Sequence, residues 1–357
     1  MDLSASNPTE CGFQYASHGI MRALCSPRTI EYNPDPQGLE IARRAVSAYY
    51  AGKSKKVSPE KIVLTTSTSE GYSFIFRLIC NPGDELLVPS PSYPLFDFLA
   101  EIQDVKLKRY PLIYDHGWQV DLHALEQALT ERTRGMIVVH PNNPTGHFTK
   151  TAEAAAINRL CVDREIVIIA DEVFLDYSLA SGSPLSFCAS QEALTFTLSG
   201  LSKTSGLPQM KLAWMVVSGP EKLRQDALAR LELIADTYLS MNAPIQLATP
   251  VFLEMRHGFQ QQVMTRVRTN LAELDRRLGA QQHCSRLEVE GGWYVVLRVP
   301  ATQSDEDLAL ELLEQKNVYL HPGHFYDFRQ EGHLVVSLIT PESEFAEGIQ
   351  RLLAIYE

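Results

Sequence analysis

The feature of this sequence that most constrains its fold is a repeated alternation of short apolar segments with segments of helical pattern. Between consecutive apolar segments, stretches such as residues 151–162 carry apolar side chains at helical spacing. Continuous apolar strands separated by helices are typical of a mainly parallel sheet that is buried on both faces. The alternation therefore predicts a layered α/β domain. The apolar segments are residues 62–66, 85–88, 136–139, 166–170, 194–198 and 212–217.

The pattern changes after about residue 243. Residues 250–281 show a long polar and apolar periodicity that predicts a helix, and strands are expected at 292–299 and 334–339. A closing helix is expected at 343–356. This part of the chain predicts a second, smaller α+β domain.

Composition excludes several classes of protein. The 357 residues are 45% hydrophobic and 21% charged, which is typical of a globular chain of about two domains. The formal net charge is −11 and no basic face stands out, so a nucleic-acid partner is not expected. No apolar run reaches the roughly 18 residues of a membrane span. The first residues lack a signal-peptide pattern, and the six cysteines show no metal-ligand spacing and are expected to be reduced, so we expect a cytoplasmic protein without a bound metal.

Three polar groups follow three of the apolar segments. Asn143 lies in the segment His-Pro-Asn-Asn-Pro-Thr-Gly, Asp171 directly follows the segment 166–170, and Lys203 follows 194–198 in Ser-Gly-Leu-Ser-Lys. Each alone is weak, since such residues are usually a turn asparagine, a helix-capping aspartate and a solvated lysine. Their order and spacing match successive strand and connection units, so all three can converge at one edge of a sheet.

An amine, a carboxylate and an amide suit pyridoxal 5'-phosphate. A lysine holds the aldehyde of this cofactor as a Schiff base, a carboxylate keeps its ring nitrogen protonated, and a donor is needed at its phenolic oxygen. Lys203, Asp171 and Asn143 can fill these three roles, respectively. The ordered triplet therefore predicts a pyridoxal phosphate site.

On these motifs, the chain from about Asn7 to its C-terminus resembles the class I/II aminotransferases, which are fold type I pyridoxal phosphate enzymes similar to aspartate aminotransferase. The resemblance implies a large three-layer α/β cofactor domain at residues 15–245 and a smaller α+β domain formed by 1–14 and 246–357. It implies transfer of an amino group between an amino acid and a 2-oxo acid, with Lys203 and Asp171 as catalytic residues. It also implies a cytoplasmic homodimer with shared active sites.

The phosphate of the cofactor is expected at the start of a helix. Backbone N–H groups and hydroxyls after strand 62–66 can bind a dianion, and the resemblance assigns Thr68 and Ser69 to it. Lys211 stands where the family most often has an arginine against the phosphate, and Gly200 stands where it often has a serine. Ser202 remains a candidate hydroxyl donor. The alternative is a Ser/Thr-rich helix start that only caps the helix.

Two tyrosines complete the set of expected cofactor residues. The resemblance places Tyr93 as a stacking partner of the pyridine ring, where the alternative is a core tyrosine. It places Tyr32 at the phosphate of the neighbouring subunit, which implies a homodimer. The alternative is a turn tyrosine that packs locally.

The sequence departs from the family pattern at two positions that bear on function. Phe174 stands where a tyrosine is common, and Val335 stands where the family has the arginine that binds the substrate carboxylate in a bidentate manner. Either another cation, with Arg298 and Arg329 as candidates, takes that part, or the substrate is not an ordinary α-amino acid. Residues 320–326, with two histidines, are expected to border the cleft. A lyase, oxidase or cyclase is therefore an alternative activity, and a non-catalytic binding protein is a further alternative.

Overall fold

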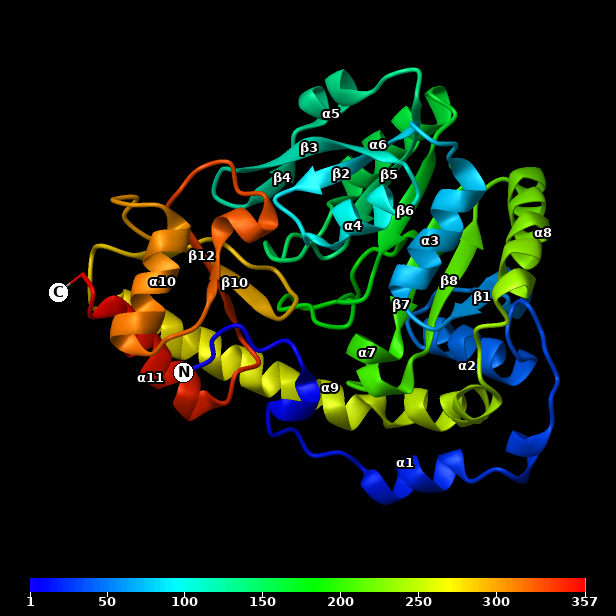
Figure 1. The fold of residues 1–357 in the computed structure, drawn as a ribbon, viewed down its shortest axis with the longest axis horizontal. Coiled ribbons are helices and arrows are strands. Elements are labelled where there is room, and N and C mark those ends of the chain that lie inside the picture. Colours follow the sequence, from blue (N-terminus) through cyan, green and yellow to red (C-terminus); the bar gives the residue numbers. More distant parts are fainter. Residues whose placement is uncertain (357) are drawn as a thin grey trace.

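The fold contains two separate β-sheets with helices around them (Figure 1). The structure is a computed structural model, and it describes residues 1–356. The larger sheet has eight strands in the order β1-β8-β7-β6-β5-β2-β3-β4, and the smaller has four in the order β11-β12-β10-β9. The α/β fold class predicted from the sequence is confirmed.

The centre of the large sheet is parallel, as predicted. Strands β3, β2, β5, β6 and β7 run parallel to one another in that order, and antiparallel pairing occurs at β7–β8, β8–β1 and β3–β4. The strands are β1 (Ile62–Thr65), β2 (Glu85–Ser90), β3 (Lys106–Tyr114), β4 (Trp118–Val120), β5 (Thr133–Val139), β6 (Val167–Asp171), β7 (Thr195–Gly200) and β8 (Ala213–Ser218).

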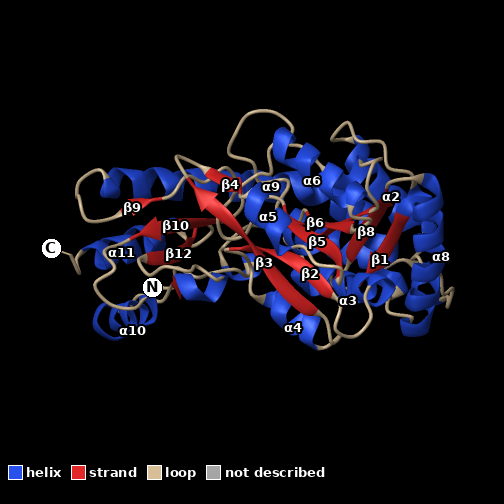
Figure 2. Ribbon diagram, turned by 90° about the horizontal axis from the view of Figure 1, so that it is seen from above, coloured by secondary structure: helices blue, strands red, loops and turns tan. Residues whose placement is uncertain are grey.

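The helices of this part cover both faces of the sheet. Figure 2 shows α3 and α4 on one side of the strands and α5 and α6 on the other. This arrangement explains why β6, β7 and β8 are buried along their whole length. The helices up to residue 238 are α1 (Ser17–Leu24), α2 (Glu40–Ala51), α3 (Thr68–Ile79), α4 (Leu95–Glu101), α5 (Leu122–Ala128), α6 (Thr151–Asp163), α7 (Leu201–Thr204) and α8 (Glu221–Tyr238).

The predicted strands all form, with ends that differ by a few residues, but β3 and β4 were not predicted. Strand β3 alternates exposed and half-buried residues along its first part and carries several charged side chains, so it lacks the continuous apolar run of the central strands. Such a pattern is hard to distinguish from that of a loop.

The small sheet lies beside helices α9 (Ala243–Leu278), α10 (Asp305–Lys316) and α11 (Glu342–Leu353) (Figure 1). The N-terminus pairs with it, since the Leu3 amide donates to the Tyr319 carbonyl at 2.8 Å and the Ser337 amide donates to the Leu3 carbonyl. The division of the chain into domains at residues 14 and 245 stays a prediction. The strands of this sheet are β9 (Ser285–Arg286), β10 (Tyr294–Arg298), β11 (His321–Pro322) and β12 (His333–Ser337).

Helix α9 begins earlier than predicted. The polar and apolar periodicity of the sequence placed its start at Pro250. In the structure Asn242 caps the helix by accepting from the Ile245 amide at 3.1 Å, and Pro250 lies in the helix interior. The single long helix connects the region of the large sheet with that of the small sheet (Figure 1).

Candidate active site

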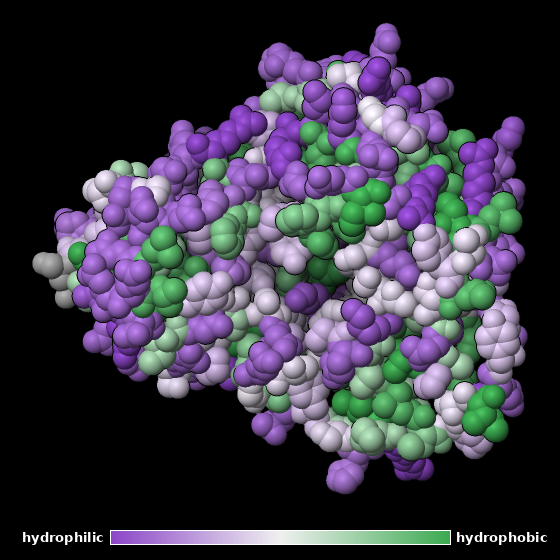
Figure 3. Space-filling view, viewed as in Figure 1, coloured by the Kyte–Doolittle hydropathy of each residue, from purple (hydrophilic) through white to green (hydrophobic). Residues whose placement is uncertain are grey.

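A pocket of about 420 Å³ lies at the carboxyl ends of the central parallel strands. Figure 3 shows a hollow near the middle of the molecule on the face that it views. Side chains from both sheets line the pocket. Open α/β sheets bind ligands at the carboxyl ends of their strands, where this pocket lies. Seven of the nine predicted site residues line it: Thr68, Ser69, Tyr93, Asn143, Asp171, Ser202 and Lys203.

Lys203 lies in the short helix α7, directly after β7, and its amine points into the pocket. Its Nζ lies 4.7 Å from the centre of the Trp293 ring and 3.4 Å from the Ser6 carbonyl oxygen. Burial lowers the pKa of Lys203 to about 8, although Cys11 and Asp171 oppose this shift. A substantial fraction of the amine is therefore neutral near physiological pH, and a neutral amine is the form that attacks an aldehyde.

Asp171 is the last residue of β6 and is buried at the base of the pocket. Its Oδ2 accepts a hydrogen bond from the Tyr72 hydroxyl at 2.9 Å, and its Oδ1 accepts one from the Val173 amide at 3.1 Å. Burial raises the pKa of Asp171, while these two hydrogen bonds and the charge of Lys203 lower it. A buried carboxylate of this kind favours a cationic partner such as a protonated ring nitrogen.

Asn143 follows β5 and is buried at the edge of the pocket. Its Oδ1 has no hydrogen-bond partner, whereas the neighbouring Asn142 accepts from the Thr145 hydroxyl at 2.9 Å. A buried polar atom without a partner is costly, so such a group in a pocket is suited to a polar ligand atom.

The start of α3 forms a further wall of the pocket. Ser67 caps the helix by accepting from the Glu70 amide at 3.1 Å, which leaves Thr68 and Ser69 in the first turn beside the pocket. The N-terminus of this 12-residue helix favours an anion. A Cβ at Gly200 would approach the Cβ of Ala213 to 2.9 Å, so this structure has no room for the serine that the family often has there.

Lys211 is the one predicted residue of the cofactor set in this subunit that the structure does not bring to the pocket. Its side chain is exposed, and its backbone is left-handed with φ of 48° at the end of a short turn of 3-10 helix. That backbone conformation cannot be inferred from the sequence pattern.

The first departure from the family pattern, Phe174, is not compensated by the nearby Tyr177. Phe174 lines the pocket, and its ring centre lies 5.5 Å from Lys203 Nζ. The hydroxyl of Tyr177 donates to the backbone carbonyl of Lys203 at 2.6 Å and does not line the pocket. Tyr177 therefore supports the backbone of α7 and gives no second donor to a ligand.

The second departure is Val335. Among residues 1–356, no arginine lines the pocket. Val335 is buried in β12, the Arg298 guanidinium lies 5.6 Å from the Tyr114 ring outside the pocket, and Arg329 is exposed. Of the two histidines in the predicted cleft segment, His321 lines the pocket and His324 does not. Neither candidate arginine therefore replaces the missing one.

Several pocket residues were not predicted. Tyr72 lies four positions after Thr68 in α3, so helical spacing could have indicated that the two share a face. Tyr294 and Tyr326 come from the small sheet and the turn after β11, and no sequence signal linked them to the large sheet. Ser6 reaches the pocket because the N-terminal segment packs on the small sheet.

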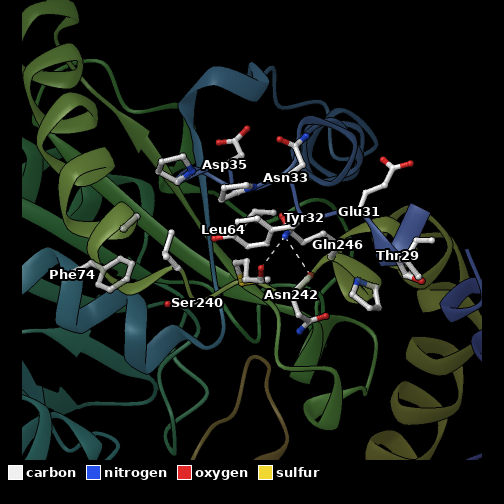
Figure 4. Close-up of a pocket in the computed structure, with 18 residues that line it drawn as sticks. Thr29, Glu31, Tyr32, Asn33, Asp35, Leu64, Phe74, Ser240, Asn242 and Gln246 are labelled. Atoms are coloured by element: carbon white, nitrogen blue, oxygen red, sulfur yellow. Dashed lines mark hydrogen bonds between the residues drawn. The ribbon is translucent and has the colours of Figure 1, made fainter. Parts of the chain in front are cut away.

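Tyr32 lies away from this pocket, in the segment between α1 and α2. It is 81% exposed, and Figure 4 shows it beside Asn242 and Gln246 at the start of α9. Its predicted contact with a neighbouring subunit stays a prediction.

The residues present fit pyridoxal 5'-phosphate. The pocket holds a partly neutral lysine amine, a buried carboxylate, an amide with an unmatched polar atom, and a helix start with two hydroxyls. Within residues 1–356, no helix combines the length and the apolar character that crossing a membrane requires.

The chain is similar to proteins that are named as aminotransferases. Glutamate-pyruvate aminotransferase AlaA of Escherichia coli strain K12 is 27% identical over 346 residues, covering 93% of this chain and 84% of that protein. Alanine aminotransferase of Mycobacterium tuberculosis strain H37Rv is 26% identical over 364 residues, covering 99% of this chain and 84% of that protein. The solved alanine aminotransferase from Pyrococcus furiosus has a TM-score of 0.90 at 24% identity, covering 99% and 91% of the two chains.

These relatives are named as aminotransferases and do not favour the lyase, oxidase or cyclase alternatives. Over residues 1–352 the chain matches the family described as Aminotransferase class I and II. The chain therefore belongs to the class I and II aminotransferases, which use pyridoxal 5'-phosphate to transfer amino groups between amino acids and 2-oxo acids.

Proposed function

We propose that Lys203, Asp171 and Asn143 carry the amino-group transfer of this enzyme, and that its amino donor and acceptor are small, such as alanine, glutamate and their 2-oxo acids. The observation that supports the roles is the convergence of these side chains in one pocket at the carboxyl ends of β5, β6 and β7. The choice of substrates rests on the names of the relatives, a glutamate-pyruvate and an alanine aminotransferase.

Lys203 has two parts in this proposal. Its amine is the group that bonds to the aldehyde of the cofactor, and as a free amine it moves a proton from the Cα of the substrate. Burial beside the Trp293 and Phe174 rings supports both, because a pKa of about 8 leaves neutral amine available near pH 7.5. Pyridoxal phosphate, when bound, supplies the electron sink that makes the Cα proton acidic.

Asp171 and Asn143 hold the ring in this proposal. The Asp171 carboxylate keeps the ring nitrogen protonated, and the Tyr72 hydroxyl orients that carboxylate through Oδ2. Asn143 donates from its side-chain NH2 group to the phenolic oxygen, while its Oδ1 atom, which has no hydrogen-bond partner in the structure, is an acceptor for a separate donor. Tyr93, which is 44% exposed at the pocket, stacks on the ring.

The phosphate is bound by the first turn of α3. The backbone amides there, the hydroxyls of Thr68 and Ser69, and the Ser202 hydroxyl supply donors. Lys211, which is exposed in this structure, would reach the phosphate only after its side chain turns inward, so it is the weakest member of the proposed set.

A homodimer is a further part of the proposal. Ile30 and Tyr32 are 91% and 81% exposed, and Met21 and Leu239 are also more than half exposed. Figure 3 shows apolar side chains gathered on the α1 side of the viewed face. Exposed apolar side chains in one region favour a partner surface, and a second copy would bring its Tyr32 toward a neighbouring site. A cytoplasmic location is also proposed, and it is supported by six cysteines that are all free thiols.

Spectral titration of the cofactor-loaded enzyme tests the function. We expect alanine or glutamate to bleach the yellow colour of the bound cofactor and a 2-oxo acid to restore it. Borohydride reduction followed by peptide mapping tests the site, and we expect the cofactor label on the peptide that contains Lys203. Lys203→Ala should lose the label, and Lys211→Ala should keep it. Release of ammonia without any need for an oxo acid would contradict amino-group transfer.

A further inference from the structure

His321 occupies the position across the sheet from the missing arginine. Strand β11 pairs with β12 in antiparallel register, and His321 lies directly opposite Val335. Residues directly opposite each other in such a pair project from the same face of the sheet and have neighbouring side chains. The imidazole of His321 therefore starts from the strand beside the one that would carry the arginine, on the same face.

Unlike Val335, His321 reaches the pocket. Val335 is 1% exposed and does not line the cavity, whereas His321 is half-buried and lines it together with Tyr326. The Nδ1 atom of His321 lies 3.0 Å from the Tyr326 hydroxyl oxygen, within hydrogen-bond distance. The rings of Tyr319 and Phe325 contact the imidazole at centroid distances of 6.0 and 5.7 Å, which restricts its orientation.

This pair keeps one donor free whichever way its internal hydrogen bond runs. If the Tyr326 hydroxyl donates to Nδ1, the imidazole carries its proton on Nε2 and can donate from there. If Nδ1 donates to Tyr326, the Tyr326 hydroxyl is free to donate. In both cases the pair offers one N–H or O–H group to an acceptor in the pocket, and a carboxylate is the strongest acceptor that a substrate of this enzyme carries.

No neighbouring acid competes for that donor in the structure. Asp2 is the acidic residue whose charge acts on His321, and its Oδ1 accepts from both the amide and the hydroxyl of Ser4 at 2.7 Å. Tyr93 and Tyr294 line the pocket beside the pair, and burial raises the pKa of both phenols, as it does for Tyr326, so these groups are neutral near pH 7. The Tyr319 phenol ring also contacts the imidazole. Among the described pocket residues, Lys203 is the other basic group, and it is committed to the cofactor in our proposal.

We propose that His321, with Tyr326, binds the α-carboxylate of the substrate in place of the arginine absent at position 335. The inference rests on the proposed function, in that it takes the substrate to be an α-amino acid. His321 and Tyr326 would then determine specificity, and carboxylate recognition in this enzyme would depend on hydrogen bonding from a half-buried imidazole instead of a guanidinium fork.

Binding of 2-methylalanine to the holoenzyme tests this proposal without turnover, because this amino acid has no Cα proton to remove. Its dissociation constant can be measured from the change in absorbance of the bound cofactor. We expect His321→Val to weaken binding about 10- to 100-fold, as for the loss of a hydrogen bond to a charged group. His321→Gln, which keeps an N–H donor, should recover most of the loss.

His324→Val is the matched control, since His324 lies three residues away, is exposed, and does not line the pocket. It should bind 2-methylalanine as the wild type does. A second test uses Val335→Arg in the His321→Val protein, where a guanidinium from the neighbouring strand should restore binding. Tyr326→Phe should weaken binding less than His321→Val does.

Two results would overturn the proposal. One is an unchanged affinity of His321→Val for 2-methylalanine. The other is a wild type that does not bind 2-methylalanine but reacts with isopropylamine, an amine without a carboxylate, as well as it reacts with alanine. Failure of the proposed function gives a different pattern. A wild type that binds 2-methylalanine in a His321-dependent manner, but exchanges no amino group with alanine or glutamate, would refute the reaction and leave the carboxylate site standing.

Discussion

The Tyr72 hydroxyl donates a hydrogen bond of 2.9 Å to Oδ2 of Asp171, inside the pocket that Lys203 also lines. Both side chains are buried, so water cannot replace this bond easily. Burial raises the pKa of Asp171, and the bond from Tyr72 is one of the interactions that lower it. Tyr72 is thus a positioning residue that helps Asp171 to stay ionised.

Tyr72→Phe is expected to shift the acid limb of the pH profile of kcat/KM toward higher pH. The substitution removes a donor to the ionised carboxylate, so the pKa of Asp171 rises further above its ordinary value. Tyr110→Phe is the control, because its buried hydroxyl donates to the Ile137 carbonyl at 2.8 Å, away from the pocket. An unchanged acid limb in Tyr72→Phe would refute this role.

Substitutions of the adjacent residues Asp171 and Glu172 should have different effects on kcat. Asp171→Asn is expected to lower kcat by at least about 100-fold, because a neutral amide cannot hold a proton on the ring nitrogen. Glu172 turns away from the pocket and accepts from the Ser186 hydroxyl at 2.8 Å and the Phe187 amide at 2.6 Å. Glu172→Gln should therefore change kcat little. Equal losses in steady-state kinetics of the two variants would contradict the assignment of Asp171.

The position of the proposed catalytic groups could be predicted from the sequence to a useful extent. Asn143, Asp171 and Lys203 each follow a continuous apolar run, and such runs form neighbouring parallel strands whose carboxyl ends meet. Thr68 and Ser69 were assigned by the family resemblance, and in the structure they lie in the first turn of α3, beside the pocket.

The rest of the pocket could not be predicted for physical reasons that differ between residues. Tyr294 and His321 reach the site through the packing of the small sheet, and a periodic pattern contains no information on how two sheets meet. Lys211 is exposed and has a left-handed backbone at a non-glycine position, a conformation that costs free energy and is set by the surrounding turn. Strand β3 was missed because its charged, half-exposed residues resemble those of a loop.

Tyr177→Phe is expected to destabilise the fold. Its hydroxyl donates to the Lys203 carbonyl at 2.6 Å in the buried backbone of α7, and removing it leaves that carbonyl without this partner. The expected loss is about 1–3 kcal/mol in the free energy of unfolding, measured by urea denaturation. Tyr32→Phe, whose side chain is exposed, is the control and should unfold at the wild-type urea concentration. A Tyr177→Phe midpoint equal to that of the wild type would refute this prediction.

Glu172 should make the stability of the protein depend on pH. Burial raises the pKa of Glu172 from its ordinary value of 4.5 to about 7, although hydrogen bonds from Phe187 and Ser186 oppose the shift. Below pH 4.5 the carboxyl is protonated in both the folded and the unfolded state and adds no penalty. Between pH 4.5 and 7 the unfolded state loses its proton first, so the folded state is destabilised progressively, and above pH 7 the penalty is constant.

Glu172→Gln removes this titration. Relative to the wild type, the variant should gain stability as the pH rises from 4.5 to 7.5, by about 3 kcal/mol in the free energy of unfolding, and gain no more above that range. Urea denaturation of both proteins at several pH values measures the difference, which includes the electrostatic coupling of Glu172 to the adjacent Asp171. If the two stability curves run parallel from pH 4.5 to 7.5, Glu172 is ionised in the folded protein throughout, and its hydrogen bonds outweigh the cost of its burial.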